Sequence, residues 1–259
     1  MPLFERYIGI DYSGAATPTT SLKGLRVYTS SPASPTLEVM PPPGARKYWN
    51  RQGIALWLQE QLSDGIPTLV GMDHGFSFPM NYFIQHGLAL DWSSFLDDFH
   101  QHWPTDEDHT YVDFIRQGIV GDGLARMGDT RWRRACEVKC RAKSVFHFDV
   151  QGSVAKSTHA GLPWLRHLRK RFGSALHAWP FDGWDIPVNR SVILEAYPAL
   201  YKLRYATEDR TPDQHDAYAI ASWLRDTDAS GDLRRFLSPE LSADERTKAK
   251  VEGWILGVN

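Results

Sequence analysis

Acidic residues end two short apolar runs in the first third of the chain. Asp11 follows Tyr7-Ile8-Gly9-Ile10, and Asp73 follows Thr68-Leu69-Val70-Gly71-Met72. Apolar runs of this length predict buried strands, and open α/β sheets place their ligands at the carboxyl ends of strands. A carboxylate in such a place is costly to bury unless something pairs with it. We therefore expect Asp11 and Asp73 to lie in a site that holds a cation.

Two more acids stand at the start of a predicted helix late in the chain. Thr211 and Pro212 are a strong start signal for a helix, which should run to about Arg225. Asp213 and Asp216 are three residues apart, so they share one face of this helix. The same face continues through apolar residues, and Asp216 should therefore point toward the core. Asp213 could instead serve only to offset the helix dipole.

Carboxylates from two strand ends and one helix suit a divalent metal. Mg²⁺ and Mn²⁺ prefer hard oxygen ligands. Two such ions about 3.5–4 Å apart can activate water and stabilise the leaving oxygen when a phosphodiester is cleaved. Without a cation the crowded carboxylates would repel one another, and some would have to stay protonated.

The remaining pattern predicts a single α/β domain over residues 1–259, built on a five-stranded mixed sheet flanked by helices. Besides the two runs above, strands are expected at 22–30, 36–40 and 191–195, the first two of these in an antiparallel meander. Helices are expected at 46–63, 79–103 and 154–171, with another opened by a capping box at 105–108 and one or two short ones in 232–256. Residues from about 79 to about 145 are expected to form a mostly helical insertion after the fourth strand.

This order of strands and acids resembles the ribonuclease H-like fold. Short motifs resemble, more closely, domain-of-unknown-function family 429, which is described as predicted nucleases of that fold: Ile8-Gly9-Ile10-Asp11, Gly71-Met72-Asp73 through Phe78-Pro79, Leu194-Glu195-Ala196-Tyr197-Pro198 and His215-Asp216-Ala217. The segment Asp213-x-x-Asp216-Ala-x-Ala also looks like the closing helix motif of Holliday-junction resolvases of the RuvC type. The resemblance covers roughly 5–78 and 190–225.

The resemblance implies a metal-dependent nuclease that acts on nucleic acid through a two-metal carboxylate site. Asp11, Asp73 and Asp216 carry over as catalytic ligands of Mg²⁺ or Mn²⁺, and Asp213 carries over through the resolvase motif alone. Glu195 matches a family position after the fifth strand and could be a ligand or lie behind the ligands. The chain departs from the family at His74, where a small residue and proline are usual. His74 could be a base or a ligand, although a solvated histidine is the simpler interpretation.

A basic segment that contains one aromatic residue is a candidate substrate-binding surface. It consists of Arg131, Trp132, Arg133 and Arg134, and residues 166–171 add a second basic cluster. Arginines around an aromatic side chain suit a phosphate backbone with a base or sugar stacked on the ring. Both clusters could equally be a solvated face that balances nearby acids.

Small polar residues at the start of the 154–171 helix offer a second candidate for substrate contacts. Ser153 and Lys156 would suit a phosphate at a helix N-terminus, although the spacing of a P-loop is absent. Cys136, Cys140 and His147 lack a fourth ligand and have loose spacing for zinc, so two ordinary thiols are expected.

Composition limits the class of protein and its surroundings. A net charge of −2 provides no overall attraction for nucleic acid, which must be held by a local patch. Two cysteines favour a reducing compartment, and no apolar run approaches the roughly 20 residues of a membrane span. With no basic-then-apolar leader, we expect a cytoplasmic protein with no membrane partner, and the sequence predicts no oligomeric state.

Two other functions stay open at this point. Asp-x-Ser-Gly after the first strand also resembles the phosphate loop of sugar-kinase and actin-type ATPases, which normally need a second such domain and a second glycine-rich loop. A non-enzymatic module that binds nucleic acid on the same fold is the other alternative. Metal binding distinguishes the three functions, because only the nuclease should bind Mg²⁺ or Mn²⁺ without nucleotide.

Overall fold

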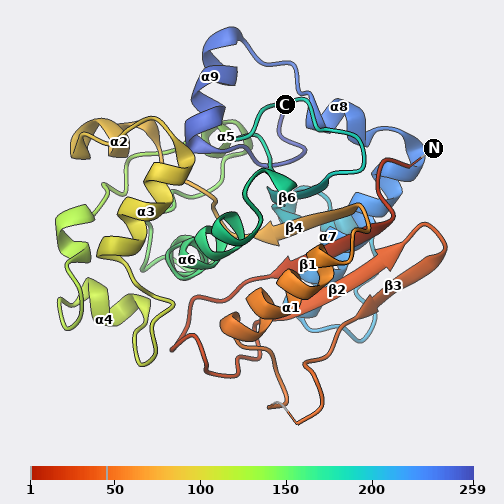
Figure 1. Ribbon diagram of the computed structural model, residues 1–259, viewed down its shortest axis with the longest axis horizontal. Coiled ribbons are helices and arrows are strands. Elements are labelled where there is room, and N and C mark those ends of the chain that lie inside the picture. The colour runs from red at the N-terminus through yellow and green to blue at the C-terminus, as the bar shows by residue number, and fades with distance from the viewer. Residues whose placement is uncertain (1, 45) are drawn as a thin grey trace.

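One mixed sheet of six strands runs through the protein, whose computed structural model describes residues 2–44 and 46–259 (Figure 1). The strand order is β3-β2-β1-β4-β6-β5. Strands β1, β4, β6 and β5 are parallel, and β2 is antiparallel to both of its neighbours. The bounds are β1 Arg6–Asp11, β2 Arg26–Ser31, β3 Ser34–Glu38, β4 Thr68–Asp73, β5 Leu176–Ala178 and β6 Ser191–Glu195.

The predicted α/β class and the mixed sheet are confirmed, but the count of five strands is wrong. The additional strand is β5, which pairs with β6 at the edge of the sheet. Three residues are too few to show the alternation by which a strand is recognised. The second strand also begins later than predicted, because residues 22–25 form a turn in which Leu25 N donates to the Leu22 carbonyl oxygen.

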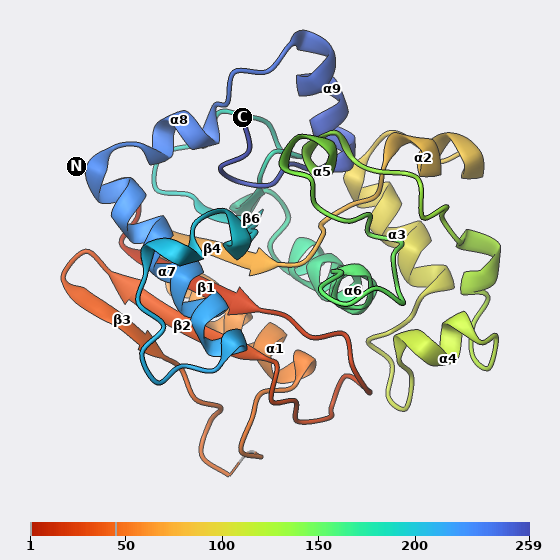
Figure 2. The same cartoon turned by 180° about the vertical axis from the view of Figure 1, so that it is seen from behind.

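Helices cover both faces of the sheet. Helix α7 (Pro212–Ser230) crosses one face, over β1 and β2 (Figure 2). Helices α1 (Arg51–Ser63) and α6 (Ala155–Phe172) contribute to the hydrophobic core on the other face. Alternate residues of each strand point to opposite faces, so Ile8 and Ile10 enter the α1/α6 core while Tyr7 enters the core on the α7 side.

Glycine at two neighbouring strand positions lets α7 lie unusually close to the sheet. Gly9 and Gly71 are register partners in β1 and β4. A Cβ on Gly9 would lie 2.3 Å from the carbonyl oxygen of Ala217, and a Cβ on Gly71 would lie 2.7 Å from Ile220 Cγ2. A side chain at Gly9 would therefore collide with the backbone of α7, and one at Gly71 would collide with Ile220.

Short helices occupy most of the region between β4 and α6, and the expected helix over 79–103 is divided in two. Helix α2 ends where Gly87 takes a left-handed conformation, and Asp91 caps α3 through a hydrogen bond from Ser94 N. The helix predicted from the capping box at 105–108 does not form, because Thr105 Oγ1 instead donates to the His159 carbonyl oxygen. The bounds are α2 Met80–His86, α3 Trp92–His102, α4 Val112–Arg116, α5 Ala135–Cys140, α8 Leu233–Leu237 and α9 Ala243–Glu252.

The other predicted elements agree more closely with the structure. Helix α1 starts five residues later than the expected 46, at a cap formed by Asn50. Helix α7 begins at the predicted Thr211 cap but continues to Ser230 rather than ending near Arg225. In the described ranges, 2–44 and 46–259, no helix is long and apolar enough to span a membrane.

We predict that Gly9→Ala destabilises the protein, because its Cβ would meet backbone atoms of α7 that cannot move independently. Overpacking of this kind costs about 3 kcal/mol, which lowers Tm by about 6–12 °C in a chain of this size. Gly24→Ala is the matched control, since a Cβ there meets only ordinary contacts at 3.6 Å or more. Equal Tm values for the two variants, measured by calorimetry, would contradict the close-contact interpretation.

Candidate functional site

The two strand-end acids lie side by side on the face of the sheet that α7 covers. Asp11 and Asp73 are register partners at the carboxyl ends of the parallel strands β1 and β4. Each is two residues beyond a glycine that contacts α7, so the pleat directs both carboxylates toward that helix. The two acids expected at the ends of separate strands therefore lie beside each other in the sheet.

Helix α7 brings Asp213 and Asp216 to the same edge. Asp216 precedes Ala217, whose carbonyl oxygen faces Gly9, and Asp213 lies one turn nearer the start of the helix. Together with Asp11 and Asp73 they line one cavity of about 520 Å³. We call this the acid cavity and define it by these four aspartates.

The acids in this cavity disfavour one another's charge. Burial raises the pKa of Asp11 well above its ordinary value, and the charges of Asp73, Asp213 and Asp216 raise it further. Burial, followed by the charges of Asp216 and Glu195, raises the pKa of Asp73 to about 8. A bound cation would relieve this repulsion, so the chemistry of the donor set fits Mg²⁺ or Mn²⁺.

A lysine that the sequence analysis did not identify forms an ion pair with one of the acids. Lys202, in the short 3-10 turn η4 (Lys202–Arg204), donates from Nζ to both carboxylate oxygens of Asp216, at 2.9 and 3.0 Å. Over residues 2–44 and 46–259, no three or more His, Cys, Asp or Glu side chains are arranged to hold a metal ion. The expected set of Asp11, Asp73 and Asp216 is thus brought together in one cavity but is not assembled as three ligands.

Both predicted contacts at the start of α6 lie in the same cavity. Ser153 and Lys156 line it together with the loop Ser13-Gly14 that follows β1. A Cβ on Gly14 would lie 2.0 Å from the Lys156 carbonyl oxygen, so the absence of a side chain lets the loop pack against the first turn of α6. Lys156 Nζ donates to Asp113 Oδ2 at 2.6 Å.

Glu195 does not join the acid cavity, and the pleat of β6 explains why. Glu195 is the register partner of Met72, whose side chain enters the α1/α6 core on the face opposite α7. There its carboxylate accepts two hydrogen bonds of 2.6 Å from Arg134, and both side chains are almost completely buried. Glu195 is therefore the partner of a buried arginine in this structure rather than part of the four-aspartate group.

The arginine segment is not exposed as one continuous surface. Arg134 is buried between Glu195 and Glu137, so it cannot contact a substrate. Trp132 is half-buried and packs against Phe146, with ring centroids 6.3 Å apart. Of this segment, Arg131 and Arg133 remain exposed, and neither lines the acid cavity. Arg131 pairs with Asp129, and Arg133 donates to the carbonyl oxygens of Glu137 and Ala142.

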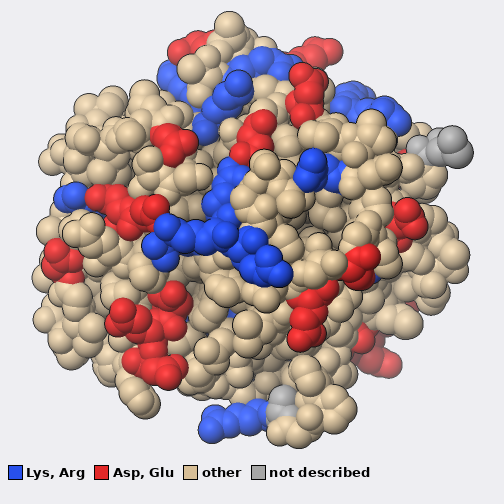
Figure 3. Space-filling view, viewed as in Figure 1, with Lys and Arg blue, Asp and Glu red and all other residues tan. Residues whose placement is uncertain are grey.

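The second basic cluster lies at the far end of α6 from the acid cavity. Lys and Arg side chains gather over α6 on the face shown in Figure 3, where acids flank them. Arg166 and Lys170 are both paired with Asp97. A rise of 1.5 Å per residue places Arg169 about 20 Å along the helix from Lys156. This cluster therefore does not border the candidate site.

His74 is buried rather than solvated, contrary to the simpler of the two expectations. Its ring lies between Tyr12 and Phe76, with centroid distances of 4.6 and 5.2 Å, and burial lowers its pKa to about 4. His74 does not line the acid cavity. Cys136 is buried, Cys140 is half-buried, and neither forms a disulfide.

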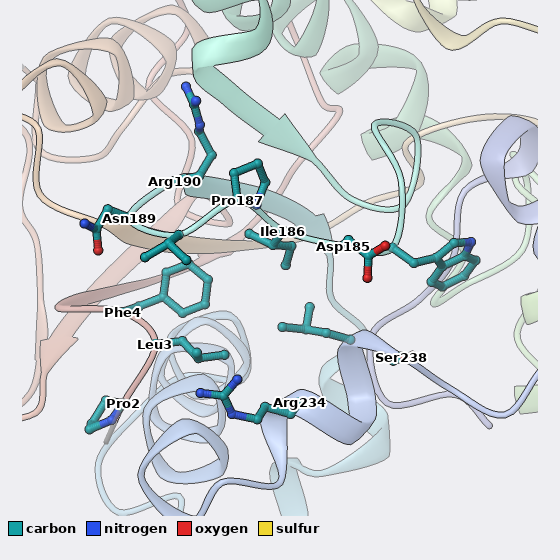
Figure 4. Close-up of a pocket in the computed structure, with 13 residues that line it drawn as sticks. Pro2, Leu3, Phe4, Asp185, Ile186, Pro187, Asn189, Arg190, Arg234 and Ser238 are labelled. Carbon is teal, nitrogen blue, oxygen red and sulfur yellow. The ribbon is translucent and has the colours of Figure 1, made fainter.

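A second cavity, of about 430 Å³, lies beside the start of β1 and has different chemistry (Figure 4). Its wall includes the apolar side chains of Phe4, Ile186 and Pro187, and Asp185 is its single carboxylate among the described residues. In Figure 4 the Arg190 side chain extends away from these apolar groups. This cavity lacks the group of acids on which the sequence-based hypothesis depends.

No family model, curated protein or solved structure matches the chain. The resemblance to domain-of-unknown-function family 429 and to RuvC-type resolvases therefore stays a prediction from the sequence.

We predict that the metal-free protein loses stability as the pH rises from 5 to 8. The pKa of Asp73 is about 8 in the folded chain against an ordinary 3.8. Between these values the folded chain holds a proton that the unfolded chain has released, so stability falls with rising pH. In EDTA at pH 8, Asp73→Asn should raise Tm by about 4 °C, which corresponds to roughly 1–2 kcal/mol.

Asp129→Asn is the control for this measurement. Arg131 lowers the pKa of Asp129 to about 2, so removing that charge should give no stabilisation at pH 8. A parent protein whose Tm stays level or rises from pH 5 to 8 would contradict the crowded-acid interpretation.

We also predict that Glu195→Gln destabilises the protein whether or not Mn²⁺ is present. It breaks the buried ion pair between Arg134 and Glu195, which typically costs about 3–5 kcal/mol, and leaves Glu137 as the carboxylate paired with Arg134. Arg131→Gln, which removes one member of an exposed pair, should leave Tm within a degree or so of the parent. Thermal unfolding in EDTA and in Mn²⁺ tests this, and an unchanged Tm for Glu195→Gln is the contrary result.

Proposed function

We propose that the acid cavity is the catalytic site of a hydrolase that cleaves phosphodiester bonds in nucleic acid with the aid of Mg²⁺ or Mn²⁺. The observation that carries the proposal is the convergence of Asp11, Asp73, Asp213 and Asp216 on one cavity. These residues come from two strands and one helix that are far apart in the sequence. Acids that line one cavity and raise one another's pKa are candidates for a functional site.

The strand order supports the choice of reaction class. The first four strands follow the order β3-β2-β1-β4, with β2 antiparallel and β6 added beside β4. We take this arrangement as ribonuclease H-like, with β5 as an additional strand at the edge of the sheet. In this proposal α7 takes the place of the closing helix of that fold.

Asp11 and Asp73 are the residues proposed to hold the cation. Among the described residues, neither carboxylate forms an ion pair, and the one hydrogen bond to Asp11, from the Tyr12 backbone, leaves oxygens of both acids for a cation. Asp216 would become a third ligand once its ion pair with Lys202 is broken. A bound divalent ion would supply an activated water and stabilise the leaving oxygen of the phosphodiester.

The other side of the cavity is suited to a phosphate group. Helix α6 has 18 residues and its first turn, with Lys156, lines the cavity. The partial positive charge of a helix N-terminus favours an anion at this point. Ser153 can donate a hydroxyl hydrogen bond to the same group. These residues would bind and orient the substrate opposite the acids.

We predict that the purified protein cleaves at least one nucleic acid in Mg²⁺ or Mn²⁺ and that Asp11→Asn abolishes the cleavage without unfolding the chain. The substrates to compare are single-stranded DNA, duplex DNA, a four-way DNA junction and single-stranded RNA. The cleavage rate should fall at least about 100-fold. Changing a residue that only supports a metal ligand already costs up to about 100-fold in activity, and Asp11 is proposed to be a ligand itself. Asp216→Asn should have a similar effect.

Asp129→Asn makes the same change of charge outside the cavity and should cleave at the parent rate. If Asp11→Asn cleaves at the parent rate, the acid cavity is not the catalytic site. Binding of Mn²⁺ only when ATP is present would instead favour the ATPase alternative, and a protein that binds nucleic acid but never Mn²⁺ would favour the non-enzymatic module.

A further inference from the structure

Lys202 gives Asp216 a counter-charge that the other acids of the cavity lack. Among the described residues, it is the only side chain that forms an ion pair with one of the four aspartates. Lys156 also lines the cavity, but its ammonium group is paired with Asp113, which does not. Of the two lysines that line the cavity, Lys202 is thus the one paired with an acid of the cavity, and that acid is Asp216 on α7.

The backbone that carries Lys202 is fixed to α7 by two contacts. The ring of Tyr201 is buried and stacks on Trp223, with centroids 4.2 Å apart and planes within 3° of parallel. His215 Nε2 donates to the Lys202 carbonyl oxygen at 3.2 Å. Adjacent residues of α7, His215 and Asp216, therefore hold the main chain and the side chain of the same lysine.

The side chain of Lys202 can leave Asp216 without moving this backbone. It is 35% exposed, whereas the Asp216 side chain is 18% exposed. The ammonium group is carried by a flexible four-carbon chain, so rotation about side-chain bonds suffices to release the carboxylate. No rearrangement of η4 or α7 is required.

Lys202 and a divalent cation would compete for the same oxygens. Both Asp216 oxygens accept hydrogen bonds from Nζ, and two positive charges a few ångströms apart repel strongly in a partly buried site. We propose that Lys202 is an internal counter-ion, which pairs with Asp216 in the metal-free protein and lowers the affinity of the cavity for Mg²⁺ or Mn²⁺. Lys202 thereby sets the cation concentration at which the site is filled. This inference rests on the proposed function.

Titration with Mn²⁺ alone, in the absence of any substrate, tests this role. Free Mn²⁺ is measured by its electron paramagnetic resonance signal, and heats of binding provide a second measure. Lys202→Met should bind Mn²⁺ roughly tenfold more tightly than the parent, because it removes one charge and frees Asp216. Lys202→Arg keeps a cation able to pair with Asp216 and should restore an affinity close to that of the parent.

Lys156→Met is the matched control, since it removes the same charge from the same cavity wall without freeing one of the four aspartates. It should change the affinity for Mn²⁺ by less than about threefold. In EDTA at pH 8, Lys202→Met should also have a lower Tm than the parent, because Asp216 loses its counter-charge. Circular dichroism confirms that each variant is folded before the titration.

The results separate this inference from the proposed function. If the parent binds Mn²⁺ and Lys202→Met binds it no more tightly, Lys202 is not a competitor, while the cation site itself stands. If neither protein binds Mn²⁺, both the inference and the proposed function are overturned. If Lys156→Met binds Mn²⁺ as tightly as Lys202→Met does, the loss of any positive charge from the cavity wall explains the tighter binding. That result would overturn the specific role of Lys202.

Discussion

The contact between α7 and the glycines of β1 and β4 determines where the candidate site forms. Gly9 and Gly71 lie beside each other in the sheet, and they let α7 approach until its backbone and Ile220 touch the strands. Because a helix is rigid over one or two turns, fixing Ala217 above Gly9 also fixes Asp216 above the strand ends. The contact that packs α7 onto the sheet therefore also determines where its acids lie.

Gathering the acids has a cost that the fold only partly offsets. Burial and mutual repulsion raise the pKa values of Asp11 and Asp73, whereas Asp216 has Lys202 as a neighbour. Glu195, by contrast, is paired with the buried Arg134. Among the described residues, the adjacent carboxylates of Asp11 and Asp73 have no ion-pair partner, and this difference from Glu195 supports the proposed use of the cavity.

The sequence predicts the strand-end acids and the start of α7 because each depends on local signals, namely an apolar run or a helix cap. It misses Lys202, which stands in a short 3-10 turn with no motif around it. It also leaves open whether Glu195 is a ligand or lies behind the ligands, because the face of the sheet that Glu195 occupies follows from its register with Met72, which the sequence does not show. Arg134 is indistinguishable in the sequence from its exposed neighbours, since its burial depends on Glu195, 61 residues away.

The distribution of positive charge limits how the proposed substrate could be recognised. The arginine segment is either buried or engaged with its own loop, and the basic end of α6 lies about 20 Å from Lys156. Positive groups that line the acid cavity are therefore local: Lys156, Lys202 and the first turn of α6. With a net charge of −2 there is no long-range attraction to compensate. A phosphodiester would accordingly be held by contacts to one or two phosphates at the cavity, rather than along an extended basic surface.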